Sequence, residues 1–199
     1  MKKNNDKVLQ VDGVSCERNY IRILRDISFS INEGQILLIR GKNGSGKTSL
    51  LKIIAGILSF TGTIIFRDDV KNLGYVGHKN AIKLNDTVEQ HIIFWKNLYN
   101  SGKEVSNVIN IFKLHDIYDL PVYFLSFGQK KKLCFVRLYL LGSKLWLLDE
   151  PLTGLDKNNK LFISNMLSNH ANNGGAAILT THEVSYFPKN NKVKELFID

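Results

Sequence analysis

The segment Gly41-Lys-Asn-Gly-Ser-Gly-Lys-Thr48 directly follows the apolar segment Ile36–Arg40. Its spacing matches G-x-x-x-x-G-K-[ST], a pattern typical of loops that bind phosphate groups between a strand and a helix. The continuous apolar run predicts a strand that is buried on both faces, and residues 49–57 predict the helix that follows. The sequence therefore predicts an α/β fold built around a phosphate-binding loop (P-loop).

Each part of this loop suits a triphosphate. The glycines let backbone N–H groups point inward, and the following helix places its positive end under the β-phosphate. Lys47 neutralises oxygens of the β- and γ-phosphates, and the hydroxyl of Thr48 is placed to bind Mg²⁺. An accidental loop rich in glycine and lysine is the alternative, and the strand before it and helix after it disfavour that reading. The predicted nucleotide-binding residues here are Gly41, Asn43, Gly44, Ser45, Gly46, Lys47, Thr48 and Ser49.

Composition places the chain among globular proteins. It has 199 residues, of which 44% are hydrophobic and 23% charged, and a net charge of +9. That charge suits an anionic ligand, an anionic membrane face, nucleic acid or simply a solvated surface, and it does not choose among them. Two cysteines without a metal-binding pattern favour a reducing compartment. No signal-like or membrane-spanning run is present in the sequence, so we expect a cytosolic protein that reaches a membrane only through a partner.

Strand patterns flank a helical middle segment. Apolar residues at helical spacing predict helices within 81–140, the first of them starting at a capping box of Asp86 and Glu89, and another helix over 158–170. A turn is expected at Asp12-Gly13. We expect a single domain over 1–199, with a core and β lobe from 1–80 and 141–199 and a helical lobe from 81–140. The predicted strands cover 7–11, 20–24, 27–31, 36–40, 62–66, 73–76, 145–148, 176–180 and 192–198.

A second motif supplies carboxylates. Leu145-Trp-Leu-Leu148 predicts a buried strand, and Asp149-Glu150 follows at its carboxyl end. Asp149 is placed to assist magnesium binding, and Glu150 can reach a water in line with the γ-phosphate. An Asp-Glu pair alone also caps strands and starts turns, but together with a P-loop in the same sheet it indicates nucleotide hydrolysis.

A third motif is Leu125-Ser-Phe-Gly-Gln129, which predicts a helix start with Ser126 as N-cap and Gln129 completing a capping box. The plain interpretation is a good cap and nothing more. A helix start with a glycine at its tip is also an anion site, however. One P-loop offers too few donors to surround a γ-phosphate, so the same helix tip of a second protomer could complete the site.

These motifs, in this order, resemble the ABC ATPase family along essentially the whole chain. Gly41–Thr48 matches the Walker A motif, Leu125–Gln129 the signature with Phe127 in place of a glycine, and Leu145–Glu150 the Walker B motif with its catalytic glutamate. Thr153–Asp156 matches the D-loop and His182 the switch histidine. The implied fold is a P-loop NTPase cassette with a RecA-like core sheet, a small antiparallel β lobe and a helical signature lobe.

The resemblance also implies how the chain works. Two copies would form a head-to-tail homodimer that holds two ATP molecules between P-loops and opposing signatures. Ser126, Gly128 and Gln129 would contact the nucleotide held by the partner's P-loop. Glu150 would polarise the attacking water, and His182 would hold the γ-phosphate in register.

Two positions depart from the family pattern. The aromatic residue that stacks on adenine falls near Arg18, whose guanidinium can also stack on a base, and Tyr20 is an alternative. The glutamine that touches magnesium falls at His78, which becomes a candidate magnesium ligand.

Both departures are shared with a subfamily of ABC ATPases that serves cytochrome c maturation, and local stretches such as 77–83, 136–142 and 174–182 resemble it too. That resemblance implies an integral membrane permease of cytochrome c maturation as partner, at the cytoplasmic face of the bacterial inner membrane, and ATP hydrolysis that drives haem export or release of a haem chaperone. We expect no direct haem binding, since no CxxCH appears, and no nucleic acid partner.

Other functions stay open. The chain could be the ATPase of another ABC importer or exporter, or a soluble ABC protein that acts on ribosomes or DNA. The latter generally carries paired cassettes or long insertions, which this chain lacks. A small GTPase is disfavoured because no N/TKxD base-reading motif exists.

Overall fold

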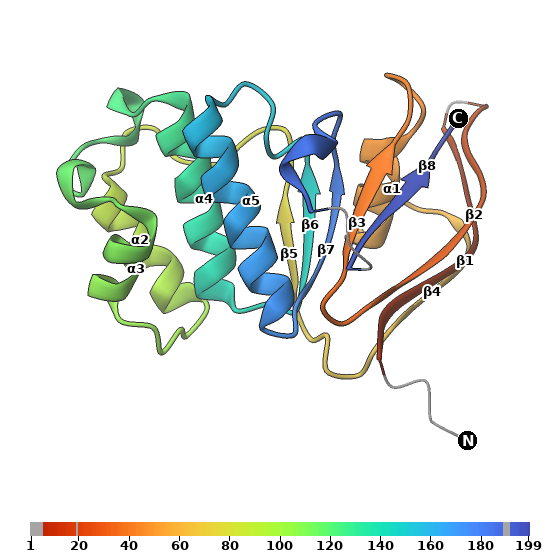
Figure 1. Cartoon of the computed structure of the whole chain (residues 1–199), viewed down its shortest axis with the longest axis horizontal. Helices are drawn as coiled ribbons and strands as arrows, with labels where there is room; N and C mark the ends of the chain where they lie inside the picture. Colours follow the sequence, from red (N-terminus) through yellow and green to blue (C-terminus); the bar gives the residue numbers. More distant parts are fainter. Residues whose placement is uncertain (1–5, 19, 189–191) are drawn as a thin grey trace.

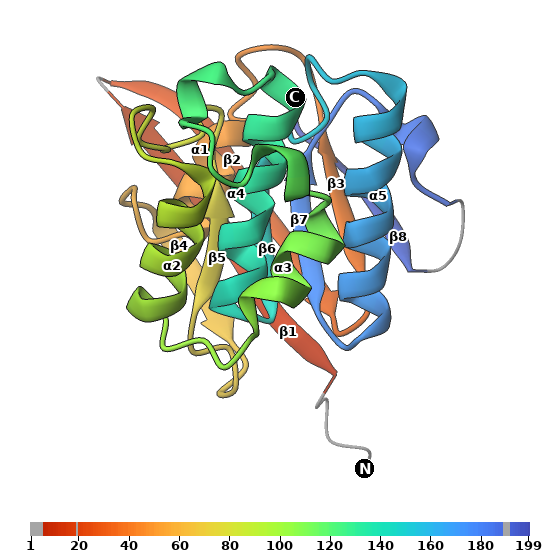
Figure 2. The same cartoon turned by 90° about the vertical axis from the view of Figure 1, so that its left-hand side faces the viewer.

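The structure is a computed structural model that describes residues 6–18, 20–188 and 192–199. A five-stranded parallel sheet forms its centre (Figure 1). Helices cover one face of this sheet, and a helix with a three-stranded antiparallel sheet covers the other. Figure 2 shows the helix-covered face, with the antiparallel sheet behind. The layers match the predicted α/β cassette.

The central sheet has the order β5-β6-β7-β3-β8. Its strands are β3 (Ile36–Arg40), β5 (Leu73–Val76), β6 (Leu145–Asp149), β7 (Ala176–Thr180) and β8 (Val193–Phe197). Every residue of β6 and β7 is buried. Because successive side chains of a strand point to opposite faces, Leu145 and Leu147 join the core on the antiparallel-sheet side, while Trp146 and Leu148 join the core under the helices.

The antiparallel sheet has fewer and longer strands than predicted. It consists of β1 (Lys7–Arg18), β2 (Ile21–Asn32) and β4 (Thr61–Phe66). The predicted turn at Asp12-Gly13 is wrong, because β1 continues through it, and the two strands predicted over 20–24 and 27–31 are one strand. The pairing of β1 and β2 shifts register between Val11 and Val14, where Gly13 has φ +61°. A bulge takes up the extra residue that the sequence pattern presented as a turn.

The helices follow the predicted stripes. They are α1 (Lys47–Ile54), α2 (Val88–Leu98), α3 (Val105–Phe112), α4 (Phe127–Leu141) and α5 (Lys157–Asn172), with short 3₁₀ turns at His115–Ile117, Val122–Phe124 and Val184–Tyr186. The capping box of α2 was predicted one residue too early. The hydroxyl of Thr87 accepts from the backbone N–H of Gln90 at 3.1 Å, and the Gln90 side chain accepts from the Thr87 N–H at 2.8 Å.

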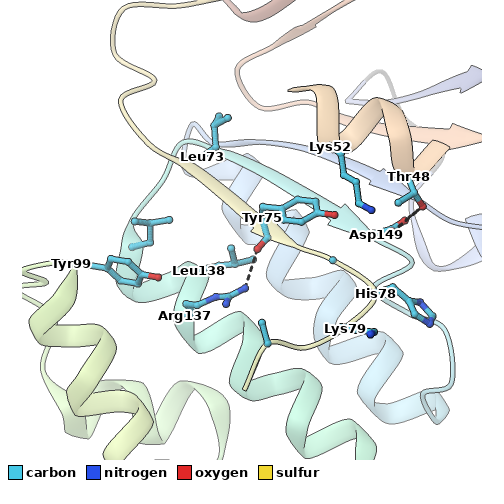
Figure 3. A pocket seen from close by; sticks show the side chains of 13 residues that line it. Thr48, Lys52, Leu73, Tyr75, His78, Lys79, Tyr99, Arg137, Leu138 and Asp149 are labelled. Atoms are coloured by element: carbon cyan, nitrogen blue, oxygen red, sulfur yellow. Dashed lines mark hydrogen bonds between the residues drawn. The ribbon is translucent and has the colours of Figure 1, made fainter. Parts of the chain in front are cut away.

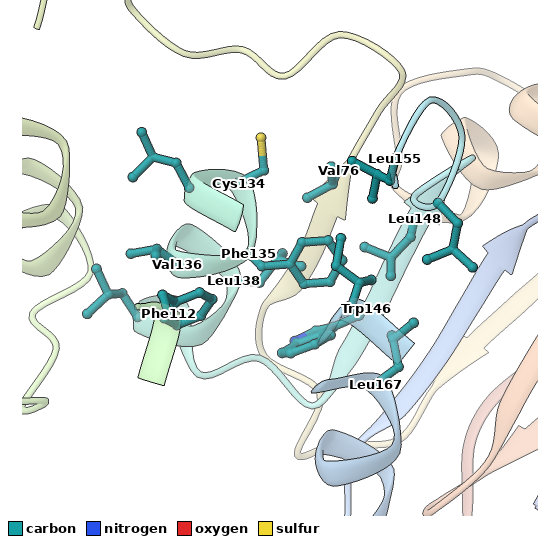
Figure 4. Close-up of a cluster of buried hydrophobic side chains, with 14 of the residues drawn as sticks. Val76, Phe112, Cys134, Phe135, Val136, Leu138, Trp146, Leu148, Leu155 and Leu167 are labelled. Atoms are coloured by element: carbon teal, nitrogen blue, oxygen red, sulfur yellow. The ribbon is translucent and has the colours of Figure 1, made fainter. Parts of the chain in front are cut away.

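One apolar core joins the helices to the sheet (Figure 4). Phe135 on α4 is fully buried and meets Trp146 on β6 edge-on, with ring centroids 6.0 Å apart. Phe112 on α3 belongs to the same core. This packing holds α4 over β6, so it fixes the position of the predicted signature relative to the Asp149-Glu150 pair.

The division into lobes at 80 and 140 stays a prediction, although α2 and α3 lie between these limits. None of the described helices has the length and apolar character needed to cross a membrane.

Candidate nucleotide-binding and hydrolysis site

The P-loop lies between the carboxyl end of β3 and the start of α1, as predicted. Two of its glycines are required by close contacts. A Cβ on Gly41 would come within 2.0 Å of the carbonyl oxygen of Ile198, and one on Gly46 within 2.6 Å of the Leu24 side chain. Gly46 also has φ +94° as the residue preceding α1. No larger residue fits these positions, so the loop keeps its tight path around the helix start.

Lys47 is held against this loop. Its ammonium donates to the carbonyl oxygens of Gly41 and Lys42, both at 2.8 Å, and the residue is only 8% exposed. An ammonium has three donors, so one remains for a further acceptor. The P-loop cavity, of about 460 Å³, is also lined by Asn43, Gly44, Gly46, Thr48, Ser49, Asp149, Glu150 and Ile23. A cation with one free donor thus lines the cavity, as binding of phosphate groups requires.

Thr48 and Asp149 are 101 positions apart in the sequence and meet at this cavity. The Thr48 hydroxyl lies 3.0 Å from both carboxylate oxygens of Asp149. Thr180, at the end of the neighbouring strand β7, donates to Asp149 Oδ1 at 2.8 Å and accepts from the backbone N–H of Glu150 at 2.8 Å. Since β6 and β7 pair Asp149 with Thr180, sheet register alone brings these groups together.

Glu150 is held in a specific orientation. Its backbone has φ +48°, a conformation that non-glycine residues seldom adopt and that often marks functional sites. The Thr153 hydroxyl donates to its Oε2 at 2.9 Å, and His182 Nε2 lies 3.6 Å from its Oε1. The side chain of His182 is 56% exposed and that of Glu150 20%. The two predicted catalytic residues therefore adjoin each other, and Glu150 also lines the P-loop cavity.

The oxygen ligands at this site suit magnesium. Mg²⁺ prefers hard oxygen ligands and is usually bound by one or two carboxylates together with substrate phosphates. The Thr48 hydroxyl and the Asp149 carboxylate supply such oxygens. Within the described ranges no group of three or more His, Cys, Asp or Glu residues could hold a metal by itself. The residues present fit a metal that arrives with a nucleotide.

His78 lies on the other side of the Thr48–Asp149 pair. It is exposed on the loop after β5 and lines a neighbouring cavity of about 600 Å³, to which Thr48 and Asp149 also contribute (Figure 3). No hydrogen bond joins His78 to either of them in the described structure. Three cationic side chains also line this cavity, namely Lys52, Lys79 and Arg137. The structure thus places His78 near the predicted metal ligands without bringing it into contact with them.

The signature residues form the predicted capping box. The Ser126 hydroxyl accepts from the backbone N–H of Gln129 at 3.2 Å, and the Gln129 side chain accepts from the Ser126 N–H at 2.7 Å. Gly128 is packed so closely that a Cβ would come within 2.4 Å of the Asn159 amide. None of the three lines the P-loop cavity of its own chain. These three residues lie together at the start of α4, outside the P-loop cavity of the same chain.

Phe127, the unusual residue of the signature, lies 51% exposed beside the predicted D-loop. A Cβ on Gly154 would come within 3.2 Å of its ring. Arg18 is exposed at the end of β1 and does not line the P-loop cavity, whereas Ile23 on β2 does. Tyr20, the alternative, is 98% exposed. The adenine-stacking role of either residue stays a prediction.

Some contacts were not predicted from the sequence. Thr180 holds Asp149, and Thr153, which was expected only as part of the D-loop, holds Glu150. Lys131, which is only 2% exposed on α4, was also not expected to be buried. Burial lowers the pKa of Lys131, while Cys134 and Asp149 oppose that shift. A polar residue at the end of a strand that pairs with β6 was a usable signal for Thr180. A lysine at a core-facing position of a helix was the signal for Lys131.

Comparison with known proteins defines the class. Residues 24–153, which include the P-loop, the signature and the Asp149-Glu150 pair, match the model of the family described as ABC transporter. The fold is shared with a nucleotide-free ATP-binding cassette from an ABC transporter, at a TM-score of 0.75 and 22% identity over 90% of this chain and 83% of that one. An ABC cassette in its ADP conformation gives 0.77 and 21%, over 91% and 85%. The chain therefore belongs to the ABC transporter family.

Within that family the similarity is specific. The chain is 33% identical over 181 residues to the cytochrome c biogenesis ATP-binding export protein CcmA of Hyphomonas neptunium, covering 91% of this chain and 93% of that protein. It is 39% identical over 176 residues to CcmA of Rickettsia conorii, covering 85% and 92%. The chain thus groups with ATP-binding proteins of the CcmA type, which are ATPases that power transport.

Proposed function

We propose that this chain hydrolyses ATP as the motor subunit of a transporter that serves cytochrome c maturation. The observation that carries the ATPase part is the contact of Thr48 with Asp149, which Thr180 links to the backbone of Glu150. A phosphate-binding loop, a metal-binding pair and a candidate base are thereby joined in one hydrogen-bonded unit.

The side chains have separable roles in this proposal. Lys47 and the N–H groups of the loop bind and orient the β- and γ-phosphates. When bound, Mg²⁺ neutralises phosphate charge, and Thr48 and Asp149 would hold it. Glu150 takes a proton from the attacking water, the Thr153 hydroxyl orients the Glu150 carboxylate, and His182 beside it holds the γ-phosphate in register.

We infer that the working unit is a head-to-tail homodimer. Ser126, Gly128 and Gln129 lie outside the P-loop cavity of their own chain, so they can contact ATP only from a second copy. The start of α4 offers backbone N–H groups and the positive end of a 15-residue helix. ABC ATPase subunits generally form dimers and pair with membrane permease components, which supports this arrangement.

The assignment to cytochrome c maturation rests on the relatives. Proteins of the CcmA type carry the name of a cytochrome c biogenesis export protein, and they match this chain over most of its length. We infer a permease of that system as partner, a place at the cytoplasmic face of a bacterial inner membrane, and haem export or haem-chaperone release as the driven step. Direct binding of haem or nucleic acid to this chain is not part of the proposal.

Co-purification and a loss-of-function variant test this proposal. We expect affinity-tagged chain to co-purify with a cytochrome c maturation permease, and cells that carry Lys47→Ala to lose ATP binding by the subunit and mature c-type cytochromes together. Capture of a permease of another system, with normal cytochrome levels in the Lys47→Ala strain, would contradict the cytochrome role but leave the ATPase assignment. Salt-sensitive binding to nucleic acid without any membrane partner would favour a soluble ABC protein.

A further inference from the structure

The ring of Phe127, at the start of α4, packs on the loop that follows Glu150. Phe127 is half-exposed, but one edge of its ring is covered. A Cβ on Gly154 would lie 3.2 Å from Cε1 of that ring and 3.7 Å from both Cδ1 and Cζ. Gly154 has φ +76° and presents its backbone, without a side chain, to these three consecutive ring atoms. The ring therefore occupies the space that a side chain at position 154 would fill.

Two further contacts hold the ring and its neighbour in place. The ammonium of Lys131, which is buried, lies over the Phe127 ring, 5.8 Å from its centroid. A cation over an aromatic ring is attracted to it, and burial limits the movement of this one. Beside the ring, a Cβ on Gly128 would come within 2.4 Å of the Asn159 amide, which donates to the Asp156 carboxylate at 2.7 Å. The ring is therefore held in place although half of it is exposed.

The turn under the ring carries the contact that orients Glu150. The Thr153 hydroxyl donates to Glu150 Oε2 at 2.9 Å, and the Thr153 N–H donates to the Glu150 carbonyl at 3.3 Å. Leu152 and Leu155 are buried and anchor the turn in the core under the helices. Thr153 and Gly154, which lie between them, are exposed. Core packing therefore does not hold these two residues directly, and the aromatic ring covers the turn at Gly154.

We propose that Phe127 is a positioning residue for ATP hydrolysis. Its ring holds the turn at Gly154, so that the Thr153 hydroxyl keeps the Glu150 carboxylate directed for proton transfer from water. The inference rests on the proposed function, because it assigns a role inside the same ATPase site. A glycine, which the family pattern places at position 127, has no side chain to make this contact. The role therefore belongs to the residue that departs from the pattern.

Direct contact with nucleotide is the alternative role for the ring. Phe127 does not line the P-loop cavity of its own chain, so such a contact would be with ATP held by a second copy. The two roles differ in their kinetics, because loss of a contact with nucleotide raises KM, whereas misplacement of Glu150 lowers kcat. The packing on Gly154 favours the positioning role, because this contact exists within a single chain.

Steady-state ATPase kinetics of the full chain separate these roles. Phe127→Ala removes the ring, and we expect kcat to fall about tenfold while KM for ATP changes by less than about twofold, because the P-loop is untouched. Phe127→Tyr keeps the ring and should recover most of kcat. Phe94→Ala is the matched control and should keep the parent kcat, since Phe94 is 54% exposed on α2 and has Lys83 5.9 Å from its ring centroid. All variants are first shown to melt as the parent does.

A double-mutant cycle tests the path through Thr153. Thr153→Val keeps the shape of the side chain and removes its hydrogen bond to Glu150, so kcat should fall about tenfold here as well. If Phe127 acts through that hydrogen bond, the Phe127→Ala/Thr153→Val double variant should be no slower than Thr153→Val alone. Losses of kcat that multiply in the double variant would show independent effects and overturn the proposal.

The remaining outcomes separate this role from the proposed function. An active parent together with an unchanged kcat in Phe127→Ala would refute the role of Phe127 and leave the ATPase assignment intact. A raised KM with unchanged kcat would show that the ring contacts the nucleotide, which also overturns the proposal. A parent that hydrolyses no ATP would contradict the proposed function itself, together with this role.

Discussion

Thr180 donates its hydroxyl to Asp149 at 2.8 Å and accepts the backbone N–H of Glu150 at the same distance. One fully buried hydroxyl thus holds both the candidate metal ligand and the peptide that sets the direction of the candidate base. Thr180 touches no expected substrate atom, so it is a positioning residue. Its contacts explain how Glu150 keeps a backbone conformation with φ +48°.

Thr180→Val should impair turnover more than nucleotide binding. Valine keeps the shape of threonine and removes both hydrogen bonds, so the Glu150 N–H and the Asp149 carboxylate lose a buried partner. We expect kcat to fall roughly 10- to 100-fold, as small misplacements of catalytic groups do, and stability to fall by about 1–3 kcal/mol. Steady-state ATPase kinetics and urea unfolding measure the two effects.

Two matched variants separate positioning from general damage. Thr180→Ser retains the hydroxyl and should recover most of kcat. Thr181→Val removes the hydroxyl of the next buried threonine, which accepts from the Glu183 N–H and does not contact Asp149. Equal losses of kcat in Thr180→Val and Thr181→Val would show that Thr180 has no special role.

Glu150→Gln should bind ATP with nearly unchanged affinity and lose turnover by a factor of about 100 or more, because an amide cannot take the proton from water. The bound ATP should then hold two copies together. Size-exclusion chromatography with light scattering, with and without ATP, measures the trapped dimer. A Glu150→Gln protein that hydrolyses ATP at the normal rate would disprove the role of Glu150 as the base.

Ser126→Arg should block closure of two copies while one copy still binds ATP. The bulky side chain would occupy the tip of α4, which is exposed and distinct from the P-loop cavity. In a Glu150→Gln background we expect the ATP-trapped dimer to disappear. Ser106→Arg, on the exposed side of α3, is the control and should leave the dimer in place. Persistence of the dimer in the Ser126→Arg protein would place the signature outside the interface.

The free energy of unfolding should fall in mild acid because of His170. Burial lowers the pKa of His170 from 6.5 to about 4, against the opposing effect of the carbonyls of Ala176 and Lys144. The unfolded chain therefore binds a proton below about pH 6.5 that the folded chain accepts only near pH 4. Stability from this group is present above the unfolded pKa and is lost as the pH falls toward the folded one.

Between pH 7.5 and pH 5, His170 should account for a loss of about 2 kcal/mol. Urea unfolding of the parent and of His170→Phe at both pH values measures it. The phenylalanine keeps a ring against Trp146 and removes the titrating group, so the variant should lose less stability over this range. Identical losses in the two proteins would show that His170 is not the acid-sensitive group.

Local residue patterns were enough to predict the parts of the site that depend on neighbouring residues. The P-loop lies between a strand and a helix, and the Ser126–Gln129 capping box forms as predicted, because glycine conformations, helix caps and neighbouring hydrogen bonds depend on residues a few positions apart. The β3, β5 and β7 strands also have the predicted bounds, since buried strands read as continuous apolar runs.

The contacts between residues on different strands and helices became visible only in the folded chain. The register of β6 and β7 sets Thr180 beside Asp149, and the packing of α4 over Trp146 sets the distance from the signature to that pair. The bulge in β1 continues a strand where the sequence pattern resembled a turn, and His78 lies beside the predicted metal ligands without contacting them. Such relations depend on pairing and packing between segments far apart in the chain, so local residue patterns do not specify them, even where a polar residue at a strand end gives a signal, as Thr180 does.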